Sequence, residues 1–212
     1  MQWSEILAEI KRSLKEPETG GHWTDSELLR RANLIQADIC RKTELLLKTG
    51  SVSFNSVTEN YSLPADCLKV VAVVYDNKRL IGTTAQQLDD KCLFNSKVWR
   101  QESGEPKMYY QEFNVINLVP KPQTANDITL HYIGVADDMV NSTDKPFNNT
   151  EQLQSASQAI IDGVIHRCML EDGNVALSDR YNSLYLQDLK DIKDLMFNVD
   201  RATEFVIARP RR

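Results

Sequence analysis

The sequence has few of the residues from which metal sites are built. Its 212 residues include three histidines and four cysteines. His22, His131 and His166 lie far apart in the chain, without the His-x-x-x-His spacing of a zinc site. No two cysteines form a Cys-x-x-Cys pair. We therefore expect no metal ion.

Glycine-rich loops are also missing. None of the eight glycines belongs to a Gly-x-x-x-x-Gly-Lys-Ser, Gly-x-Gly-x-x-Gly or Gly-x-Ser-x-Gly motif, so the sequence indicates no phosphate loop and no nucleophile elbow. The acidic stretches at residues 89–90 and 188–194 lie at helix ends or alternate with lysines, which is typical of a solvated surface. We expect no cofactor, no catalytic residue and no enzymatic activity. A hydrolase that pairs Asp66 with Asp89 or Asp90 in a cleft remains an alternative.

The chain has neither an excess of positive charge nor a long apolar run. Its net charge of −5 argues against binding to nucleic-acid phosphates, which requires a basic face. No apolar run approaches the roughly 20 residues that a membrane span needs, and the first residues do not resemble a signal peptide. All four cysteines have apolar or helical neighbours typical of buried free thiols, which indicates a reducing compartment. We expect a soluble protein that is made in a cytoplasm and binds no membrane.

Residues 1–50 have the periodicity of two helices. A first apolar stripe runs from Trp3 to Leu14, and Pro17 ends it. Residues 24–27, Thr-Asp-Ser-Glu, form a predicted capping box. The second stripe follows that box, and Lys48 and Gly50 have the residue types of a last helical turn and a C-cap. Its apolar members are Leu28, Ala32, Ile35, Ile39 and Leu46.

Residues 51–140 change to the period of two that strands show. A short helix is expected after Thr84, where another capping box begins. We expect five to seven strands, mostly antiparallel. Their predicted positions are residues 52–54, 61–63, 70–75, 80–81, 108–113, 115–119 and 128–133.

Residues 141–199 return to helical periodicity. A helix is expected from the cap at Asn149 to Gly173, and the apolar stripe of a second one runs from Leu177 to Val199. The short link between them predicts an antiparallel hairpin. The fold class is therefore α+β: a helical bundle made of residues 1–50 and the hairpin 141–199, with a mostly antiparallel β domain, residues 51–140, inserted into it.

Residues 200–212 are expected to form an extended C-terminal tail. A short apolar run and a basic end follow one another there on an acidic protein. A frayed terminus is one interpretation. The other is that the tail becomes ordered on a partner, for example by adding a strand to a sheet edge. The candidate partner-binding residues are Arg201, Phe205, Val206, Ile207, Arg209, Arg211 and Arg212.

Several short motifs occur in one order along the chain and together cover residues 23–199. They are Trp-Thr-Asp-x-Glu-Leu-Leu at 23–29, Tyr-x-Leu-Pro-x-Asp at 61–66, Gly-x-Pro-x-x-Tyr at 104–109, Asn-Leu-Val-Pro-Lys-Pro at 117–122 and Leu-His-Tyr at 130–132, followed by the helical hairpin. None of the motifs carries a catalytic signature. Their order resembles that of the head-to-tail adaptor (connector) proteins of podovirus-type bacteriophages.

The resemblance implies a structural protein of the virion neck. In that family a helical bundle carries a β-rich domain, and about 12 copies form a ring that joins the portal protein to a tail nozzle or tube protein. The C-terminal tail commonly docks on the portal, which implies that role for residues 201–212 here. DNA passes through the ring without sequence-specific binding, and an acidic wall that repels phosphates suits such a channel. The head would be completed after packaging, in the host bacterial cytoplasm.

Two further alternatives stay open at this point. One is a different neck or tail-completion protein of the same particle, such as a stopper, although the α-β-α order with long C-terminal helices favours the adaptor. A nucleic-acid-binding module would combine the basic residues 209–212 with aromatic residues of the β region as a stacking platform, against the net charge of −5. Because the sequence shows no large exposed apolar stripe, we expect the free protein to be monomeric or weakly associated.

Overall fold

The chain folds as two compact units. The computed structural model describes residues 1–17, 21–53, 60–92, 99, 103–123, 126–149 and 154–207. One unit, here called the helical unit, consists of residues 1–46 and 135–212, and the other, the β unit, of residues 47–134. The sequence placed the inserted domain at residues 51–140, a few residues later at both ends.

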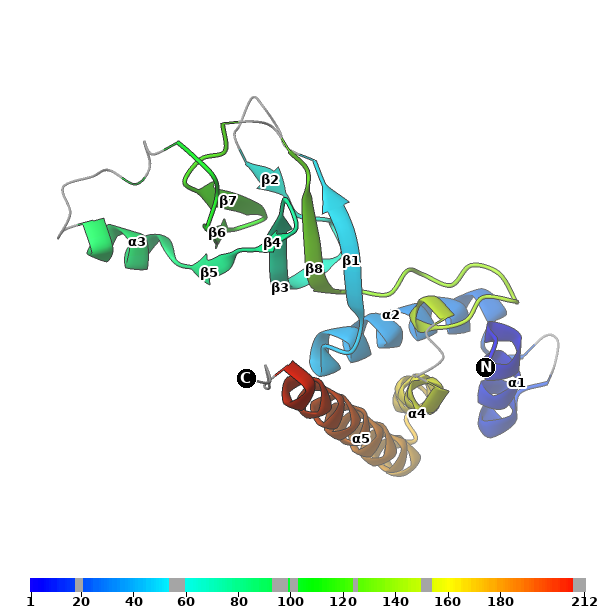
Figure 1. The fold of residues 1–212 in the computed structure, drawn as a ribbon. Coiled ribbons are helices and arrows are strands. Elements are labelled where there is room, and N and C mark those ends of the chain that lie inside the picture. Colours follow the sequence, from blue (N-terminus) through cyan, green and yellow to red (C-terminus); the bar gives the residue numbers. More distant parts are fainter. Residues whose placement is uncertain are drawn as a thin grey trace. The chain divides into compact units, whose positions relative to one another are not determined.

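Four α-helices form the helical unit, and α4 lies between α1 and α5 (Figure 1). Helix α4 buries residues on all sides, including Ala156, Ile160, Ile161, Val164 and Ile165, as expected for a central helix. A one-turn 3-10 helix, η2, precedes it. The bounds are α1 (Trp3–Leu14), α2 (Asp25–Thr43), η2 (Phe147–Asn149), α4 (Gln154–Glu171) and α5 (Val175–Ile207).

Helix α2 ends earlier than the sequence predicts. Its last residue is Thr43, followed by Glu44 in the left-handed conformation at φ 53°. Lys48 and Gly50, which resemble a helix terminus, lie instead in strand β1, where a Cβ on residue 50 would lie 3.6 Å from the ring of Tyr132. Pairing with a neighbouring strand overrides the local pattern here, because a strand that pairs along its whole length satisfies its backbone groups as well as a helix does.

Helix α5 is longer than the sequence predicts. It was expected to end at Val199, and it continues to Ile207. Residues 200–207 are therefore helical, and residues 208–212 lie outside the described part of the chain. An extended tail beyond Ile207 stays a prediction.

The β unit consists of two four-stranded sheets and one helix, α3 (Ala85–Cys92). Every strand pair is antiparallel except β5 with β6, so the mostly antiparallel sheet is confirmed, with eight strands among the described residues. The first sheet has the order β1 (Leu47–Val52), β8 (Ile128–Gly134), β3 (Cys67–Tyr75) and β4 (Lys78–Arg79). The second has the order β2 (Tyr61–Ser62), β7 (Val115–Val119), β6 (Met108–Glu112) and β5 (Ile81–Thr83).

The segment at residues 61–66 holds the β unit together. Tyr61 is fully buried, and its hydroxyl donates to the Asn126 carbonyl at 2.9 Å. At the other end of the segment, the Asp66 carboxylate accepts from Lys48 Nζ at 2.6 Å and from the Tyr132 hydroxyl at 3.3 Å. These contacts tie the segment to β1 and β8, so the motif that resembles the adaptors has a structural role.

Two carboxyl groups meet inside the hairpin of α4 and α5. Asp162 of α4 is only 5% exposed, and Gln158 Nε2 donates to its Oδ1 at 3.3 Å. Burial, together with the adjacent Asp162 carboxyl, raises the pKa of Asp188 to about 6. Burial also raises the pKa of Asp162, while the hydrogen bonds from Gln158 and Asp188 lower it. Below about pH 6 Asp188 is therefore the carboxyl that holds a proton, and the Asp162 carboxylate can accept it.

The Asp188→Asn substitution tests this proton. Because the pKa of Asp188 is higher in the folded than in the unfolded chain, its stabilising effect is complete below about pH 4 and is lost as the pH rises through about 6. An asparagine amide keeps the donor without this loss. We expect equal unfolding free energies near pH 4 and a variant more stable by about 1 kcal/mol at pH 8, allowing for the partial exposure of Asp188. Urea denaturation across that pH range measures the difference, and a constant difference would contradict the assignment.

Candidate functional site

The expected partner-binding residues lie at the C-terminal end of the chain. Arg201, Phe205, Val206 and Ile207 belong to the last turns of α5, and their side chains lie outside what the structure describes. Arg209, Arg211 and Arg212 are also outside the described residues.

A groove runs along one face of α2 in the helical unit. It consists of two adjoining hollows of about 520 and 330 Å³, which share Ser26 and Leu29. We call it the α2 groove. The larger hollow is lined by Trp3, Ser4, Leu7, Ala8, Lys11, Asp25, Ser26, Leu29, Val140 and Ser142. The smaller is lined by Ser26, Leu29, Arg30, Asn33, Leu34, Ala37 and Asp138.

The spacing along α2 explains why this helix has both a core face and a groove face. Leu28, Ala32, Ile35 and Ile39 repeat every three or four residues and are buried. The groove positions from Ser26 to Ala37 repeat in the same way on another face. Among them Leu34 is 49% exposed, and Val140 on the opposite wall is 72% exposed. The groove is therefore apolar and open to a partner.

Two amide side chains of α2 hold the far wall of the groove in place. Asn33 forms two hydrogen bonds with the backbone of Met139, donating to its carbonyl and accepting from its N–H at 3.0 Å each. Gln36 is fully buried, donates to the Asp137 carbonyl at 2.9 Å and accepts from Phe147 N–H at 3.0 Å. No local pattern in the sequence before the predicted cap at Asn149 indicates these long-range contacts.

The near wall of the groove, α1, is tied to the same loop. The N–H groups of Trp3 and Ser4, at the start of α1, donate to the carbonyls of Asp144 and Ser142 at 2.7 and 3.0 Å. These are the groups that a helix leaves without partners inside itself. The Asp144 carboxylate in turn accepts from the N–H of Val140 and of Asn141 at 2.7 Å each. The loop at residues 137–147 thus forms a fixed wall.

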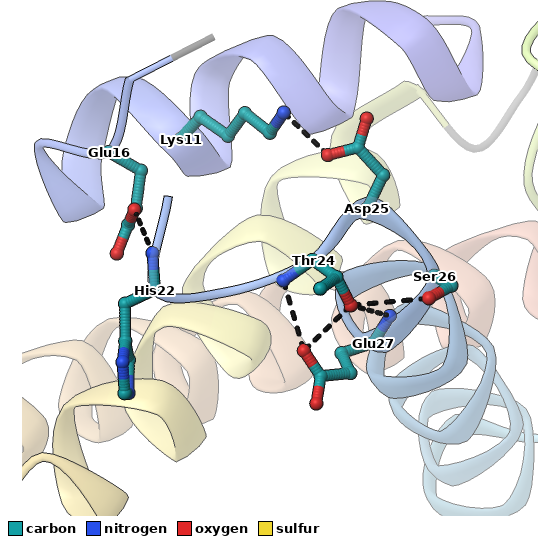
Figure 2. Close-up of polar contacts among 7 residues, drawn as sticks. All are labelled: Lys11, Glu16, His22, Thr24, Asp25, Ser26 and Glu27. Carbon is teal, nitrogen blue, oxygen red and sulfur yellow. Dashed lines mark hydrogen bonds and ion pairs between the residues drawn. The ribbon is translucent and has the colours of Figure 1, made fainter. Parts of the chain in front are cut away.

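Polar contacts fix the junction between α1 and α2 (Figure 2). The predicted capping box is confirmed: Thr24 Oγ1 accepts from Glu27 N–H at 3.3 Å, and the Glu27 carboxylate accepts from Thr24 N–H at 3.0 Å. Lys11 Nζ reaches across from α1 to the Asp25 carboxylate at 2.5 Å. Hydrogen bonds from Thr24 hold the pKa of Glu27 below its usual range.

A second set of contacts secures α2 to α4. Arg31, only 8% exposed, binds the Glu171 carboxylate with two hydrogen bonds of 2.6 and 2.7 Å. Its guanidinium also lies 4.4 Å from the centre of the Trp23 ring. The hydrogen bonds from Arg31 hold the pKa of Glu171 below its usual range. The ion pair ties α2 to α4, while Arg31 Nε and Trp23 Nε1 are buried without a hydrogen-bond partner among the described residues.

Helix α5 exposes apolar side chains that the sequence analysis did not identify. Leu177 was assigned to the buried stripe, yet it is 38% exposed, whereas Tyr185 is buried. The two lie about 80° apart around the helix, so Leu177 lies at the margin of the buried face. Leu184 and Leu195 are 40% and 49% exposed. These leucines are separated along the helix by charged residues, and the expectation of a monomeric or weakly associated free protein stays a prediction.

The other candidate groups have structural partners. Asp66, named for the hydrolase alternative, is ion-paired with Lys48 at 2.6 Å, and Asp89 Oδ1 accepts from Trp99 Nε1 at 2.7 Å. His166 Nδ1 lies 2.9 Å from the Ser178 hydroxyl. The described residues contain no group of three or more metal-ligating side chains. Across the same residues, no helix combines the length and apolar character of a membrane span.

Comparison with known families gives one match. A family model described as "SU10 adaptor protein" matches residues 1–211, which includes both units. No curated protein matches the chain. The match covers more of the chain than residues 23–199, over which the motifs and the hairpin extend.

The capping box is tested by Thr24→Ala. Loss of the side-chain acceptor leaves Glu27 N–H without its cap, so we expect the unfolding free energy to fall by about 1 kcal/mol. The pKa of Glu27 should rise toward its ordinary value, because its largest lowering contact is removed. Thr24→Ser, which keeps the hydroxyl, should change neither. Denaturant unfolding measures the loss of stability, and NMR titration measures the pKa. An unchanged pKa of Glu27 in the Thr24→Ala variant would contradict the geometry.

The hydrogen bonds between Gln36 and the loop at residues 137–147 are tested by Gln36→Leu. The substitution keeps the apolar contacts and removes two buried hydrogen bonds to the loop, so we expect a loss of about 2 kcal/mol in unfolding free energy. Hydrogen exchange at Phe147 N–H should accelerate. Gln187→Leu changes an exposed glutamine on α5 and should alter stability by less than about 0.5 kcal/mol. Equal effects of both substitutions would show that the Gln36 hydrogen bonds make no specific contribution to the unfolding free energy.

Proposed function

Because the chain belongs to the SU10 adaptor protein family, a family of structural bacteriophage proteins, we propose that it is the head-to-tail adaptor of its particle. It forms a ring between the portal protein and a tail nozzle or tube protein, and it completes the head after DNA packaging. The observation that carries this proposal is the match over residues 1–211. The podovirus type of the particle stays a prediction.

The physical properties of the chain support this role. A ring requires contact surfaces that join successive copies, and the helical unit has an open apolar groove and exposed leucines. A net charge of −5 suits a channel through which DNA slides, because acidic walls repel phosphates. The ion pairs of Arg31 with Glu171 and of Lys48 with Asp66 join structural elements of one unit, which supports a structural role.

We assign docking on the portal to the C-terminal end of the chain. Its candidate residues there are Arg201, Phe205, Val206, Ile207, Arg209, Arg211 and Arg212. Basic side chains attract an acidic surface over several ångströms and accelerate binding, while the apolar residues supply buried contact area. The adaptor would then be added at the neck only after the portal is present.

Light-scattering mass and electron microscopy test the proposal. The purified protein is measured alone and after mixing with the portal protein encoded in the same genome. We expect the full-length chain to add to the portal as a ring. Replacement of Arg209, Arg211 and Arg212 by serine should weaken this binding by about tenfold or more, with a smaller effect at high salt.

A matched control changes three exposed cations of the β unit, Lys69, Arg79 and Lys107, to serine. This control alters the net charge equally and should bind the portal as the wild type does. Equal losses in both variants would mean that only net charge matters and would remove the role of the tail. Absence of any binding by the full-length chain would refute the adaptor function itself.

A further inference from the structure

One flank of α5 carries exposed leucines in register. Leu177, Leu184 and Leu195 are 38%, 40% and 49% exposed. At 3.6 residues per turn, Leu177 and Leu195 are about five full turns apart, and Leu184 lies within about 20° of the line that joins them. The three side chains line one flank of the helix, which we call the α5 ridge, and Asp188 and Asp191 lie on or beside the same line between Leu184 and Leu195.

The α2 groove has the length of part of this ridge. From Ser26 to Ala37 the groove extends about 17 Å along α2, at 1.5 Å per residue. Leu184 and Leu195 are separated by the same number of residues and therefore also by about 17 Å. Two leucines of the ridge are thus as far apart as the two ends of the groove, one end in each hollow.

The charges beside the groove and the ridge are complementary in one register. Arg30 and Asp138 border the smaller hollow, and Arg30 adjoins Leu29, where the two hollows meet. On α5, Asp191 lies between Leu184 and Leu195, and Arg180 lies on the other side of Leu184. We place Leu184 in the smaller hollow and Leu195 in the larger one. In this register Asp191 lies beside Arg30, and Arg180 lies on the side of Asp138.

We propose that the α2 groove of one copy binds the α5 ridge of a second copy of this chain. The proposal rests on the adaptor function and specifies the contact that builds its ring. The groove and the ridge are matched in length and charge. We therefore expect a groove to bind a ridge, and neither surface to bind its own kind on a second copy.

The position of the two surfaces in the helical unit makes this contact heterologous. Helix α4 lies between α1, one wall of the groove, and α5, which bears the ridge (Figure 1). A chain therefore does not fill its own groove with its own ridge. Each bound pair keeps one free groove and one free ridge, so the contact repeats until a ring closes.

Cross-linking between copies tests the contact directly. Leu34→Cys protein is mixed with Leu184→Cys protein and treated with a short bismaleimide, with and without the portal protein. We expect a cross-linked dimer from the mixture and little from either variant alone, because the contact joins a groove to a ridge. Leu170→Cys, an exposed leucine at the end of α4 that is 53% exposed, replaces Leu184→Cys as the control. The wild-type chain with its own four cysteines gives the background.

A second set of variants tests the energetics. Leu184→Asp with Leu195→Asp should weaken association between copies in the presence of the portal protein, measured by sedimentation, by about tenfold or more. The unfolding midpoint should not fall, because both side chains are exposed. Arg30→Glu and Asp191→Arg should each weaken association, and the two together should restore it. Additive losses in the double variant would overturn the proposed register.

The outcomes separate this contact from the adaptor function. Normal rings on the portal with the Leu184→Asp, Leu195→Asp variant would overturn the groove–ridge contact and leave the adaptor function standing. Cross-linking of Leu34→Cys to the portal or to a tail protein, instead of to a second copy, would do the same. If the wild-type chain neither self-associates nor adds to the portal, both proposals fail.

Discussion

The helical unit depends on helix α2 being fixed on two faces at once. One face buries Leu28, Ile35 and Ile39 in the core, and Arg31 binds Glu171 of α4. Along the other side, Asn33 and Gln36 hold the loop that precedes η2. An amide that both donates to and accepts from backbone groups fixes a loop more precisely than apolar packing does, because its geometry is directional. The groove is therefore a consequence of how α2 is held.

The β unit begins and ends at neighbouring points of one sheet. Leu47, the first residue of β1, pairs with Ile133 near the end of β8. The chain thus enters and leaves this unit on adjacent antiparallel strands, the arrangement that lets a domain be inserted without separating the segments it interrupts. In the helical unit, residues 1–46 and 135–212 can pack together although the β unit lies between them in sequence.

The sequence predicts the elements of this fold better than their ends, and the core better than the site. Periodicity identifies α1, the core face of α2 and the hairpin, and the capping box at Thr24 fixes the start of α2 to the residue. The end of α2 is missed because Lys48 and Gly50 suit a helix terminus, while pairing with β8 draws them into a strand. The groove is missed because it depends on hydrogen bonds between residues about 100 positions apart, such as Asn33 with Met139, which leave no local pattern.

The exposed leucines of α5 give a physical reason for the order of assembly. Single leucines separated by two or three helical turns and flanked by charges such as Arg180 and Asp191 are not a continuous apolar patch, so a free subunit remains dispersed. The area that each leucine buries in one contact is small, and its gain must exceed the entropy lost when two copies associate. Copies already held on a common platform have lost most of that entropy, so the same weak contact becomes sufficient. Contacts too weak to close a ring in solution can therefore close one on a partner that holds the copies together.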